Sequence, residues 1–482
     1  MNLVNLISQE ELIKNRAQIK KVFFYRICGA GMGPAAVLVK QAGFDVHGAD
    51  SAFYPPMSTF LETTGIPLFE LQEIDSLFLK QYDLIVVGNS VSGKSEAARM
   101  IEESGVPFTS FPSALGSLVL KDKNVIGIAG THGKTTTTFF MTQLLERLGQ
   151  NPGYLVGGII EGRDPAKLGD KYFVIESDEY DSSYFHKISK FRLYELKNII
   201  LTSLEFDHAD IFSSVEKIED EFRHVIPSMK STLIFNREYP SAMKLYKEYF
   251  GRSAHQNWYL YGEGSELGPF DVKTFENGSE FTLIWQNEKV RFSSSVVGLH
   301  NVLNLSSCLI FLLSEGFTVT DVQNAALDIG MVKRRQEVRG TYRDMIVIDD
   351  FAHHPRAITV TLDAIRARFK NKKVITIFEP ISATARSSIF QVEFRNSLSA
   401  SDKVIIAKAN IPTTALNGKD LDVELLTKEI EQQGKPSVCV TNLDDLRRSI
   451  DLYTEKDAVL LVLSNRTCLG LWESGFVQEI KS

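Results

Sequence analysis

The sequence predicts an α/β protein of three domains, in which mostly parallel sheets are covered by helices. Short apolar runs alternate with stretches of helical spacing along 482 residues, a length typical of several domains. Glycine-containing or polar loops directly follow several of the apolar runs, and open α/β sheets bind ligands at such strand ends. We therefore expect a Rossmann-like N-terminal domain, a central P-loop domain with a small antiparallel appendage, and a Rossmann-like C-terminal domain.

Composition and charge exclude several classes of protein. A net charge of -7 argues against a nucleic-acid-binding surface, which would need clustered excess Lys and Arg. No apolar run approaches the length of about 18 residues that a membrane span requires. Residues 1–20 lack the apolar core of a signal peptide and predict an amphipathic helix or a loose lead-in. Four cysteines (Cys28, Cys308, Cys439 and Cys468) lie far apart without paired spacing, so we expect neither zinc nor disulfides but a cytoplasmic enzyme.

The first predicted domain, residues 21–122, begins with a strand, a glycine turn, a helix and a second strand. Gly29 and Gly31 lie in the turn, and Asp50 ends the second strand about twenty residues later. This order is typical of a nucleotide-binding unit, in which the glycines admit a phosphate and the acid binds a ribose hydroxyl. Pro34 replaces the third glycine of the usual pattern, so a tight turn without a ligand is the alternative.

A phosphate-binding loop is predicted near the start of the second domain, residues 123–332. The buried strand expected at Val125–Ala129 is followed by Gly-Thr-His-Gly-Lys-Thr-Thr and then by helical spacing. Glycines let backbone N–H groups face an anion, and the helix N-terminus adds positive potential. The usual spacing would place a glycine at Ile128, so a chance Gly-Lys-Thr is the alternative. The predicted loop consists of Gly130, Thr131, His132, Gly133, Lys134, Thr135 and Thr136.

Two acidic segments follow later strands of the same domain. The strand expected at Tyr172–Ile175 leads to Glu-Ser-Asp-Glu-Tyr-Asp, which begins at Glu176. The strand expected at Asn198–Thr202 leads to a segment that contains Glu205 and His208. An acid at the strand end beside a phosphate loop holds magnesium in phosphoryl-transfer proteins, which favours Glu176 as a ligand. A solvated acidic turn is the alternative there, and His208 is either a metal ligand or a turn histidine.

The remainder of the second domain combines aromatic strands with a helix. Alternating runs within residues 231–298, such as the one at Trp258, predict an antiparallel appendage. The helix that follows carries His300, Asn301 and Asn304 on one face. These side chains could present amides to a nucleotide base, or they could cap the helix.

A third α/β domain is predicted for residues 333–482, because further apolar runs alternate with helices there. Met345–Ile348 leads into Asp-Asp-Phe-Ala-His-His-Pro, and Val374–Phe378 leads into Glu-Pro-Ile-Ser-Ala-Thr-Ala-Arg. Three consecutive α/β units with ligand-type loops argue against a structural or scaffolding protein.

Together these motifs resemble those of the Mur ligases, which use ATP to join an amino acid or peptide to a nucleotide-linked sugar acid. The resemblance covers nearly the whole chain from Val22 onward, and the missing glycine at Ile128 is usual in that family. Besides the phosphate loop and the acidic run at Glu176, it rests on motifs in the same order: Glu205–His208, His300–Asn304, Arg334–Arg335 and Asp349–Pro355.

The resemblance implies ATP and Mg²⁺ as cofactors and gives roles to individual residues. Lys134 would bind the outer phosphates, while Arg335 would approach the γ-phosphate and His208 would bind a second metal ion near the acyl group; these three are the predicted catalytic residues. The predicted ligands of the first metal ion are Thr135 and Glu176, with Thr136 assisting. The predicted nucleoside contacts are His300, Asn301 and Asn304 for adenine and Asp350 for the ribose.

The resemblance also implies contacts with the two substrates, a UDP-linked sugar acid and a peptide. Gly29, Gly31 and Asp50 would face the UDP part of UDP-N-acetylmuramate. The residues expected on the side of the incoming peptide are His353, His354 and Arg386.

Two branches of the family share these motifs and differ in the acceptor. One adds L-alanine to UDP-N-acetylmuramate, and the other adds the murein tripeptide L-alanyl-γ-D-glutamyl-meso-diaminopimelate. Tyr54–Thr59, Leu204–Phe212 and Phe378–Pro380 resemble the tripeptide branch. That branch usually carries Arg-Ser-Asn-Thr where this chain has Ile381-Ser-Ala-Thr, which leaves the third peptide residue open, although Arg386 supplies a cation nearby.

We therefore expect tripeptide ligation through an acyl-phosphate. The alternatives are L-alanine ligation and, in a different class, an ATP-hydrolysing switch that makes no bond. The sequence does not indicate the oligomeric state.

Overall fold

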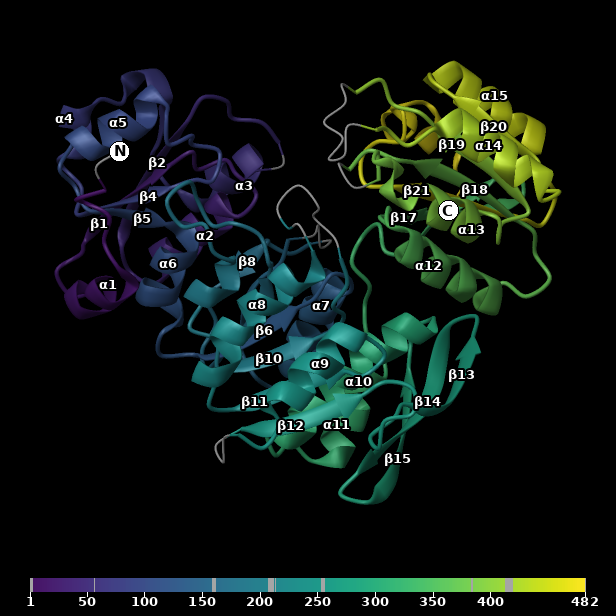
Figure 1. Ribbon diagram of the computed structural model, residues 1–482, viewed down its shortest axis with the longest axis horizontal. Coiled ribbons are helices and arrows are strands. Elements are labelled where there is room, and N and C mark those ends of the chain that lie inside the picture. Colours follow the sequence, from purple (N-terminus) through teal and green to yellow (C-terminus); the bar gives the residue numbers. More distant parts are fainter. Residues whose placement is uncertain are drawn as a thin grey trace. The chain divides into compact units, whose positions relative to one another are not determined.

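The computed structural model describes residues 3–55, 57–157, 162–206, 212, 214–252, 256–382, 385–411 and 419–481 (Figure 1). The chain divides into two compact units. Unit 1 comprises residues 1–205, 215–267 and 307–325, and unit 2 comprises residues 206–214, 268–306 and 326–482. Helix α10 (Leu299–Ser314) contributes residues to both units.

The N-terminal part of unit 1 is a five-stranded parallel sheet with the order β3-β2-β1-β4-β5. Helices α4 and α5 pack on one face through Leu79, Ala98 and Ile101, and α2 packs against α6 on the other (Figure 1). Since the strand order reverses between β1 and β4, the loops after these two strands flank the expected ligand position. The elements are β1 (Lys21–Tyr25), α2 (Met32–Gln41), β2 (Asp45–Asp50), α3 (Met57–Thr64), β3 (Leu68–Glu70), α4 (Ser76–Leu79), β4 (Leu84–Val87), α5 (Glu96–Glu103), β5 (Phe108–Ser110) and α6 (Phe111–Leu115).

Of the two alternatives predicted for residues 1–20, a helix or a loose lead-in, the structure has a helix, α1 (Gln9–Asn15). Ser8 caps it by accepting a hydrogen bond from the Glu11 backbone N–H, and Glu11 returns a contact to the Ser8 backbone. Gln9 Nε2 donates to the Leu193 carbonyl at 3.0 Å, so the lead-in segment is tied to the short 3-10 helix Lys190–Leu193.

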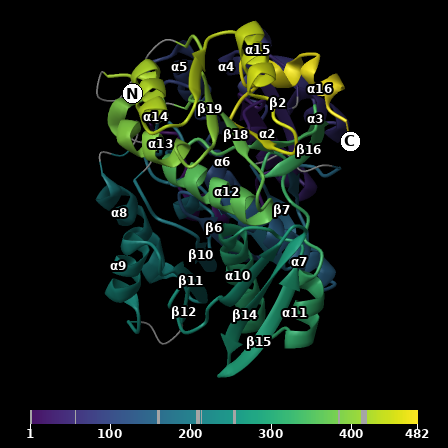
Figure 2. The same cartoon turned by 90° about the vertical axis from the view of Figure 1, so that its right-hand side faces the viewer.

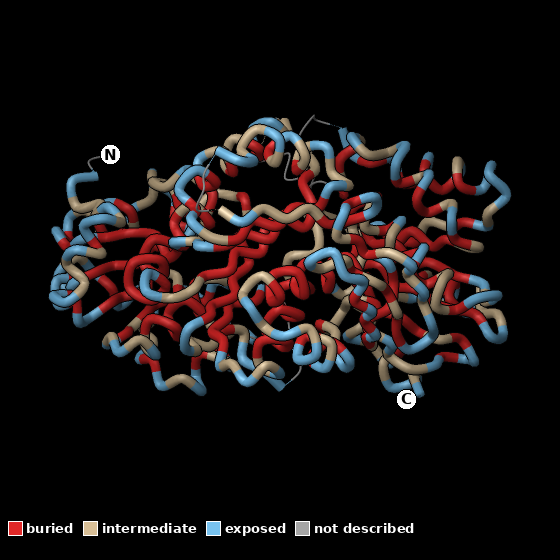
Figure 3. Tube along the Cα trace, turned by 90° about the horizontal axis from the view of Figure 1, so that it is seen from below, coloured by how far each residue is buried: buried red, intermediate tan, exposed pale blue. Residues whose placement is uncertain are grey.

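The central sheet of unit 1 has seven strands in the order β12-β11-β10-β6-β9-β7-β8, parallel except for β8. Helix α7 packs against β6, β7 and β9, α9 packs against β11, and α8 packs against α9. The central strands of this sheet consist almost entirely of buried residues, and Figure 3 shows buried residues in the interior of the chain trace. The elements are β6 (Asn124–Ala129), α7 (Lys134–Arg147), β7 (Gly153–Leu155), β8 (Ala166–Lys167), β9 (Tyr172–Ser177), β10 (Asn198–Leu201), α8 (Val215–Val225), β11 (Thr232–Asn236), α9 (Pro240–Tyr249), β12 (Asn257–Tyr261) and α11 (Val319–Ala326).

One strand was placed wrongly by the sequence argument. The aromatic run at Trp258 forms β12, a parallel edge strand that pairs with β11, and not a strand of the appendage. Alternation indicates a half-buried strand but not the direction of its partner, which explains the error. The antiparallel appendage itself is confirmed: it consists of β13 (Phe270–Phe275), β14 (Gly278–Trp285) and β15 (Glu288–Ser294), and these residues cluster in unit 2.

The C-terminal part of unit 2 is a six-stranded sheet with the order β16-β17-β21-β18-β19-β20, parallel except for β16. Helices α12, α13 and α14 cover one face, and α15 and α16 cover the other (Figure 2). The predicted third α/β domain is thus confirmed. Its elements are β16 (Glu337–Tyr342), β17 (Met345–Asp350), α12 (Pro355–Arg368), β18 (Val374–Glu379), α13 (Gln391–Leu398), β19 (Lys403–Ala407), α14 (Val423–Gln432), β20 (Ser437–Val440), α15 (Leu443–Tyr453), β21 (Val459–Ser464) and α16 (Phe476–Glu479).

Candidate active site

The predicted phosphate loop joins β6 to α7 and requires glycine at two positions. Gly130 and Gly133 have φ angles of +131° and +83°, in the left-handed region that favours glycine. A Cβ atom on Gly130 would lie 2.5 Å from Thr202 Oγ1 and 2.6 Å from the Ser203 carbonyl oxygen. Gly133 begins α7 without a side-chain cap, so the first N–H groups of this helix are available to an anion.

The end of β10 holds the loop through contacts that the sequence did not indicate. Thr202 Oγ1 donates to the His132 carbonyl at 2.5 Å, and the His132 N–H donates to Ser203 Oγ at 2.7 Å. The Glu205 N–H donates to Thr131 Oγ1 at 3.0 Å. Thr131 and His132 are therefore held by their neighbours in the fold, and the loop conformation is fixed before any ligand binds.

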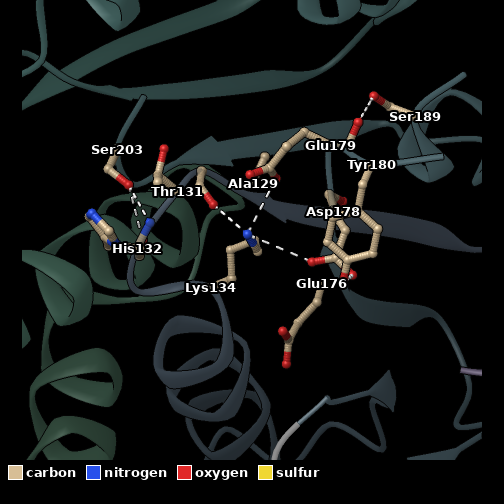
Figure 4. Close-up of polar contacts among 12 residues, drawn as sticks. Ala129, Thr131, His132, Lys134, Glu176, Asp178, Glu179, Tyr180, Ser189 and Ser203 are labelled. Atoms are coloured by element: carbon tan, nitrogen blue, oxygen red, sulfur yellow. Dashed lines mark hydrogen bonds and ion pairs between the residues drawn. The ribbon is translucent and has the colours of Figure 1, made fainter. Parts of the chain in front are cut away.

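Lys134 is enclosed by oxygen atoms. Its ammonium donates to the Gly130 carbonyl at 2.7 Å and lies 3.3 Å from Glu179 Oε2 and 3.7 Å from Asp178 Oδ1. Figure 4 shows the ammonium pointing toward these carboxylates. Burial alone would lower the pKa of Lys134, but the carboxylates of Glu179, Asp178 and Glu176 raise the pKa above its usual value. Lys134 is thus a permanent cation, as phosphate binding requires.

Thr135 and Glu176 form a hydrogen-bonded pair of oxygen-bearing side chains beside this lysine. Thr135 Oγ1 donates to Glu176 Oε2 at 3.0 Å, and the Gly157 N–H donates to Glu176 Oε1 at 2.7 Å. Burial and the nearby Asp178 raise the pKa of Glu176, whereas its hydrogen bonds and Lys134 oppose that rise. One or two protein oxygens, completed by phosphate and water, are what Mg²⁺ takes beside a nucleotide, so this pair fits the predicted metal.

His208, the predicted ligand of a second metal ion, lies outside the described residues. Within the described ranges no group of three or more His, Cys, Asp and Glu side chains gathers as a metal site. Thr136, predicted to assist the first metal ion, directly follows Thr135 in the chain and is buried in the first turn of α7.

The glycine turn of the N-terminal sheet is bound to Asp50. Asp50 Oδ2 accepts a hydrogen bond from the Cys28 N–H at 2.9 Å, and Oδ1 accepts one from Arg26 Nη1 at 3.3 Å. A Cβ on Gly31 would lie 2.9 Å from the Phe111 ring, whereas Gly29 has more space. The structure thus brings Asp50 to the turn that contains both glycines, as the sequence argument required.

Two residues predicted to bind the nucleoside, His300 and Asp350, meet around Gln336 in unit 2. His300 Nε2 lies 2.9 Å from Gln336 Nε2, and the Gln336 N–H donates to Asp350 Oδ2 at 2.8 Å. Burial, with a contribution from Arg335, lowers the pKa of His300 to about 4, so its ring is neutral at pH 7. Burial raises the pKa of Asp350, whose other oxygen accepts from the Ala352 N–H at 2.8 Å.

The other nucleotide candidates of unit 2 are Arg335, predicted for the γ-phosphate, and the two asparagines predicted for adenine. Arg335 lies over the Phe351 ring with its guanidinium carbon 5.0 Å from the centroid. Asn301 Nδ2 donates to the Val297 carbonyl at 2.9 Å, which caps the turn before α10, and Asn304 is buried one turn later. Gln336 was not predicted from the sequence, because a single glutamine forms no recognisable pattern.

The peptide-side candidates lie at the C-terminal ends of β17 and β18. His353 Nδ1 lies 3.0 Å from the Phe351 carbonyl oxygen, and the His354 ring packs edge-to-face on Phe390 with centroids 4.9 Å apart. Arg386 lines a cavity of about 80 Å³ together with Lys408 and Asp420, among other residues. Strand ends of a parallel sheet are where acceptor recognition is expected.

Ile381, which stands where an arginine was expected from the resemblance, is only 8% exposed. Ile381→Arg is therefore expected to lower the free energy of unfolding by about 3 kcal/mol, because a guanidinium would enter an apolar site. Urea denaturation followed by circular dichroism measures this loss, with Ile381→Met as the volume-matched control. Wild-type stability of the arginine variant would show that this side chain can reach solvent and the acceptor.

Comparison with known proteins agrees with this arrangement. Models of the Mur ligase family match along the chain: its catalytic domain at residues 21–123, the Mur ligase middle domain at 128–312 and the glutamate ligase domain at 334–466. The chain is 32% identical over 463 residues to the UDP-N-acetylmuramate–L-alanyl-γ-D-glutamyl-meso-2,6-diaminoheptandioate ligase of Haemophilus influenzae, covering 94% of this chain and 98% of the relative. The chain belongs to the Mur ligase family.

Further relatives place this Mur ligase more closely. The Escherichia coli enzyme of the same name is 35% identical over 401 residues, 81% of this chain and 86% of the relative. A murein peptide ligase structure from Psychrobacter arcticus matches with a TM-score of 0.65 and 28% identity over 94% of this chain and 97% of that chain. The UDP-N-acetylmuramate–L-alanine ligase of Lactococcus lactis is less similar, 29% identical over 90% of this chain and 92% of the relative.

Family membership confirms the predicted three-domain α/β architecture and an enzyme that forms a C–N bond. In the part of the chain that the structure describes, no helix is long and apolar enough to cross a membrane. The four cysteines are free.

Proposed function

We propose that this Mur ligase uses ATP and Mg²⁺ to join L-alanyl-γ-D-glutamyl-meso-diaminopimelate to UDP-N-acetylmuramate. The observation that carries the proposal is the site around Lys134, where a rigid glycine loop, a buried cation and the Thr135–Glu176 oxygen pair meet. The acceptor follows from the higher identity to the two ligases named for this tripeptide than to the L-alanine ligase. Because ATP and a nucleotide-linked sugar are its substrates, we assign the reaction to the cytoplasm.

Amide formation from a free carboxylate needs activation of that carboxylate. In the proposed reaction a carboxylate oxygen of the muramyl lactyl group attacks the γ-phosphorus, and ADP leaves with the electron pair of the broken P–O bond. The alanyl amine of the tripeptide then attacks the acyl carbon, loses a proton, and inorganic phosphate leaves. Carboxylate and γ-phosphate repel each other, so the enzyme's main task is to place positive charge between them.

Different residues of the chain are proposed to bind the phosphates, the metal ion, the nucleoside, the UDP group and the peptide. Lys134 and the N–H groups at the start of α7 would bind the phosphates, and Thr135 with Glu176 would hold Mg²⁺, which neutralises phosphate charge when bound. His300, Asn301, Asn304, Asp350 and Arg335 are proposed for the nucleoside and γ-phosphate, and Gly29, Gly31 and Asp50 for the UDP group. The peptide side is proposed to include His353, His354 and Arg386, while His208 keeps its proposed role at a second metal ion.

Phosphate release separates the proposed function from its alternatives. The enzyme is incubated with ATP, Mg²⁺ and UDP-N-acetylmuramate plus the tripeptide, L-alanine or no acceptor, and the product mass is determined. Phosphate and an amide product with the tripeptide alone support the proposal. Turnover with L-alanine would favour the biosynthetic alternative, and acceptor-independent phosphate release would indicate an ATP-hydrolysing switch.

A further inference from the structure

In the structure, the Lys134 ammonium is already paired with two carboxylates. Its ammonium contacts Glu179 at 3.3 Å and Asp178 at 3.7 Å, and the side chains of Lys134 and Glu179 are 12% and 3% exposed. Attraction between charges is stronger in such a buried site than in water. To bind nucleotide phosphates, the ammonium must therefore loosen its hold on these carboxylates.

Asp178 has a second lysine partner that the reaction scheme does not use. Lys190 Nζ lies 3.4 Å from Asp178 Oδ2, and its side chain is 12% exposed. The same ammonium lies 3.9 Å above the Tyr180 ring centroid, and the Tyr180 hydroxyl donates to Asp178 Oδ2 at 2.8 Å. Among the ion pairs of the described residues, Lys134 and Lys190 are the cations within 4 Å of the Asp178 carboxylate.

The backbone around Lys190 is fixed on both sides. Lys190 begins a short 3-10 helix, and the next residue, Phe191, is buried and stacks on Phe222 with centroids 4.9 Å apart. The preceding residue, Ser189, donates its hydroxyl to the Glu179 carbonyl, a contact drawn in Figure 4. Two adjacent residues therefore contact the acidic segment: Ser189 binds the Glu179 backbone, and Lys190 binds the Asp178 carboxylate.

We propose that Lys190 is a positioning residue for the phosphate loop: it binds Asp178 and so leaves Lys134 available to the phosphates of ATP. The physical reason is competition, because a carboxylate that shares its charge between two lysines attracts each one less. Without Lys190, the buried Asp178 carboxylate depends on Lys134 and holds it away from the nucleotide. The inference rests on the proposed role of Lys134 in binding ATP.

Binding of ATP with Mg²⁺ to the full-length protein, measured by calorimetry, tests this role. Lys190→Gln is expected to weaken binding about tenfold and to raise the KM for ATP more than it lowers kcat. Lys190→Arg keeps the charge and is expected to stay within about threefold of wild type. The matched control is Lys187→Gln, which breaks an exposed lysine–aspartate pair with Asp181 on the same segment and should bind ATP normally.

Rescue separates positioning from a general structural effect. Asp178→Asn combined with Lys190→Gln removes the competing carboxylate and should recover most of the lost ATP affinity. Tyr180→Phe removes only the hydroxyl that holds Asp178, keeps the ring under Lys190, and should weaken ATP binding in the same direction by less. Tyr180→Phe also serves if Lys190→Gln does not fold.

Wild-type ATP affinity in Lys190→Gln, or no recovery in the double variant, overturns the inference. The proposed function fails separately, if the wild-type enzyme binds ATP but forms no amide in the acceptor assay. Even then, calorimetry of ATP binding still tests the role of Lys190, because ATP binding is measured without the acceptor.

Discussion

Replacing Lys134 by methionine should lower kcat/KM for ATP-dependent ligation by about 10³-fold, as expected for loss of a cation that stabilises transition-state charge. Methionine keeps the length and packing of the side chain but removes the ammonium that faces Glu179, Asp178 and the Gly130 carbonyl. Phosphate release with UDP-N-acetylmuramate and the tripeptide measures the loss. UDP-N-acetylmuramate binding should remain close to wild type, because the glycine turn at Asp50 is a separate part of unit 1.

Loss of activity in Lys134→Met must be separated from loss of fold. Removing the lysine leaves Glu179 as a buried carboxylate without this partner, at an expected loss of about 3 kcal/mol of stability. Lys134→Met combined with Glu179→Gln removes both charges and should restore much of the unfolding temperature. Activity must stay low in the double variant; recovered ligation there would show that Lys134 serves stability and not catalysis.

The fold was largely predictable because its strands are short, buried and apolar. The runs at Val125–Ala129 and Val459–Leu463 became β6 and β21 with shifts of at most one residue at either end. Buried parallel strands are hydrophobic on both faces, so they differ clearly from helices and loops. The direction of β12 could not be predicted, since pairing depends on which neighbour the chain reaches, as with β11.

The candidate site was predictable where its residues form a continuous motif in the chain, such as a glycine-rich loop or a run of acidic residues. Gly130 to Thr135 and Glu176 are such cases, and the structure joins them through the Thr135–Glu176 hydrogen bond. Gln336 and Lys190 were not predicted, because each is a single polar residue that acquires its partners only on folding. Ile381 shows another limit: the motif located the departure from the usual arginine, but only the structure shows that this side chain is buried.

The residues that hold the phosphate loop in place were likewise not predictable from local sequence. Thr202, Ser203 and Glu205 contact Thr131 and His132, about seventy positions earlier in the chain, through the parallel pairing of β10 with β6. A short sequence motif does not indicate which distant strands will pair. Only the sheet order makes these residues part of the site.

Glu176→Gln should raise the Mg²⁺ concentration needed for half-maximal ligation and lower kcat/KM by about 10²-fold at a fixed low Mg²⁺ concentration. Glutamine keeps one oxygen, which can accept the hydrogen bond from the Gly157 N–H, and its NH2 group replaces the oxygen that faces the Thr135 hydroxyl. It lacks the negative charge that binds the cation. Mg²⁺ titrations of phosphate release in the variant and the wild type measure the change.

Glu219→Gln is the matched control, because Glu219 is a carboxylate of unit 1 that is 2% exposed and paired with Arg223 and Lys244. Its loss should lower stability without moving the Mg²⁺ titration, since neither Arg223 nor Lys244 belongs to the phosphate loop. High Mg²⁺ should recover activity in Glu176→Gln, because mass action compensates for a weaker site. An unchanged Mg²⁺ requirement would exclude Glu176 as a metal ligand and leave it the role of holding Thr135 and the backbone of Gly157.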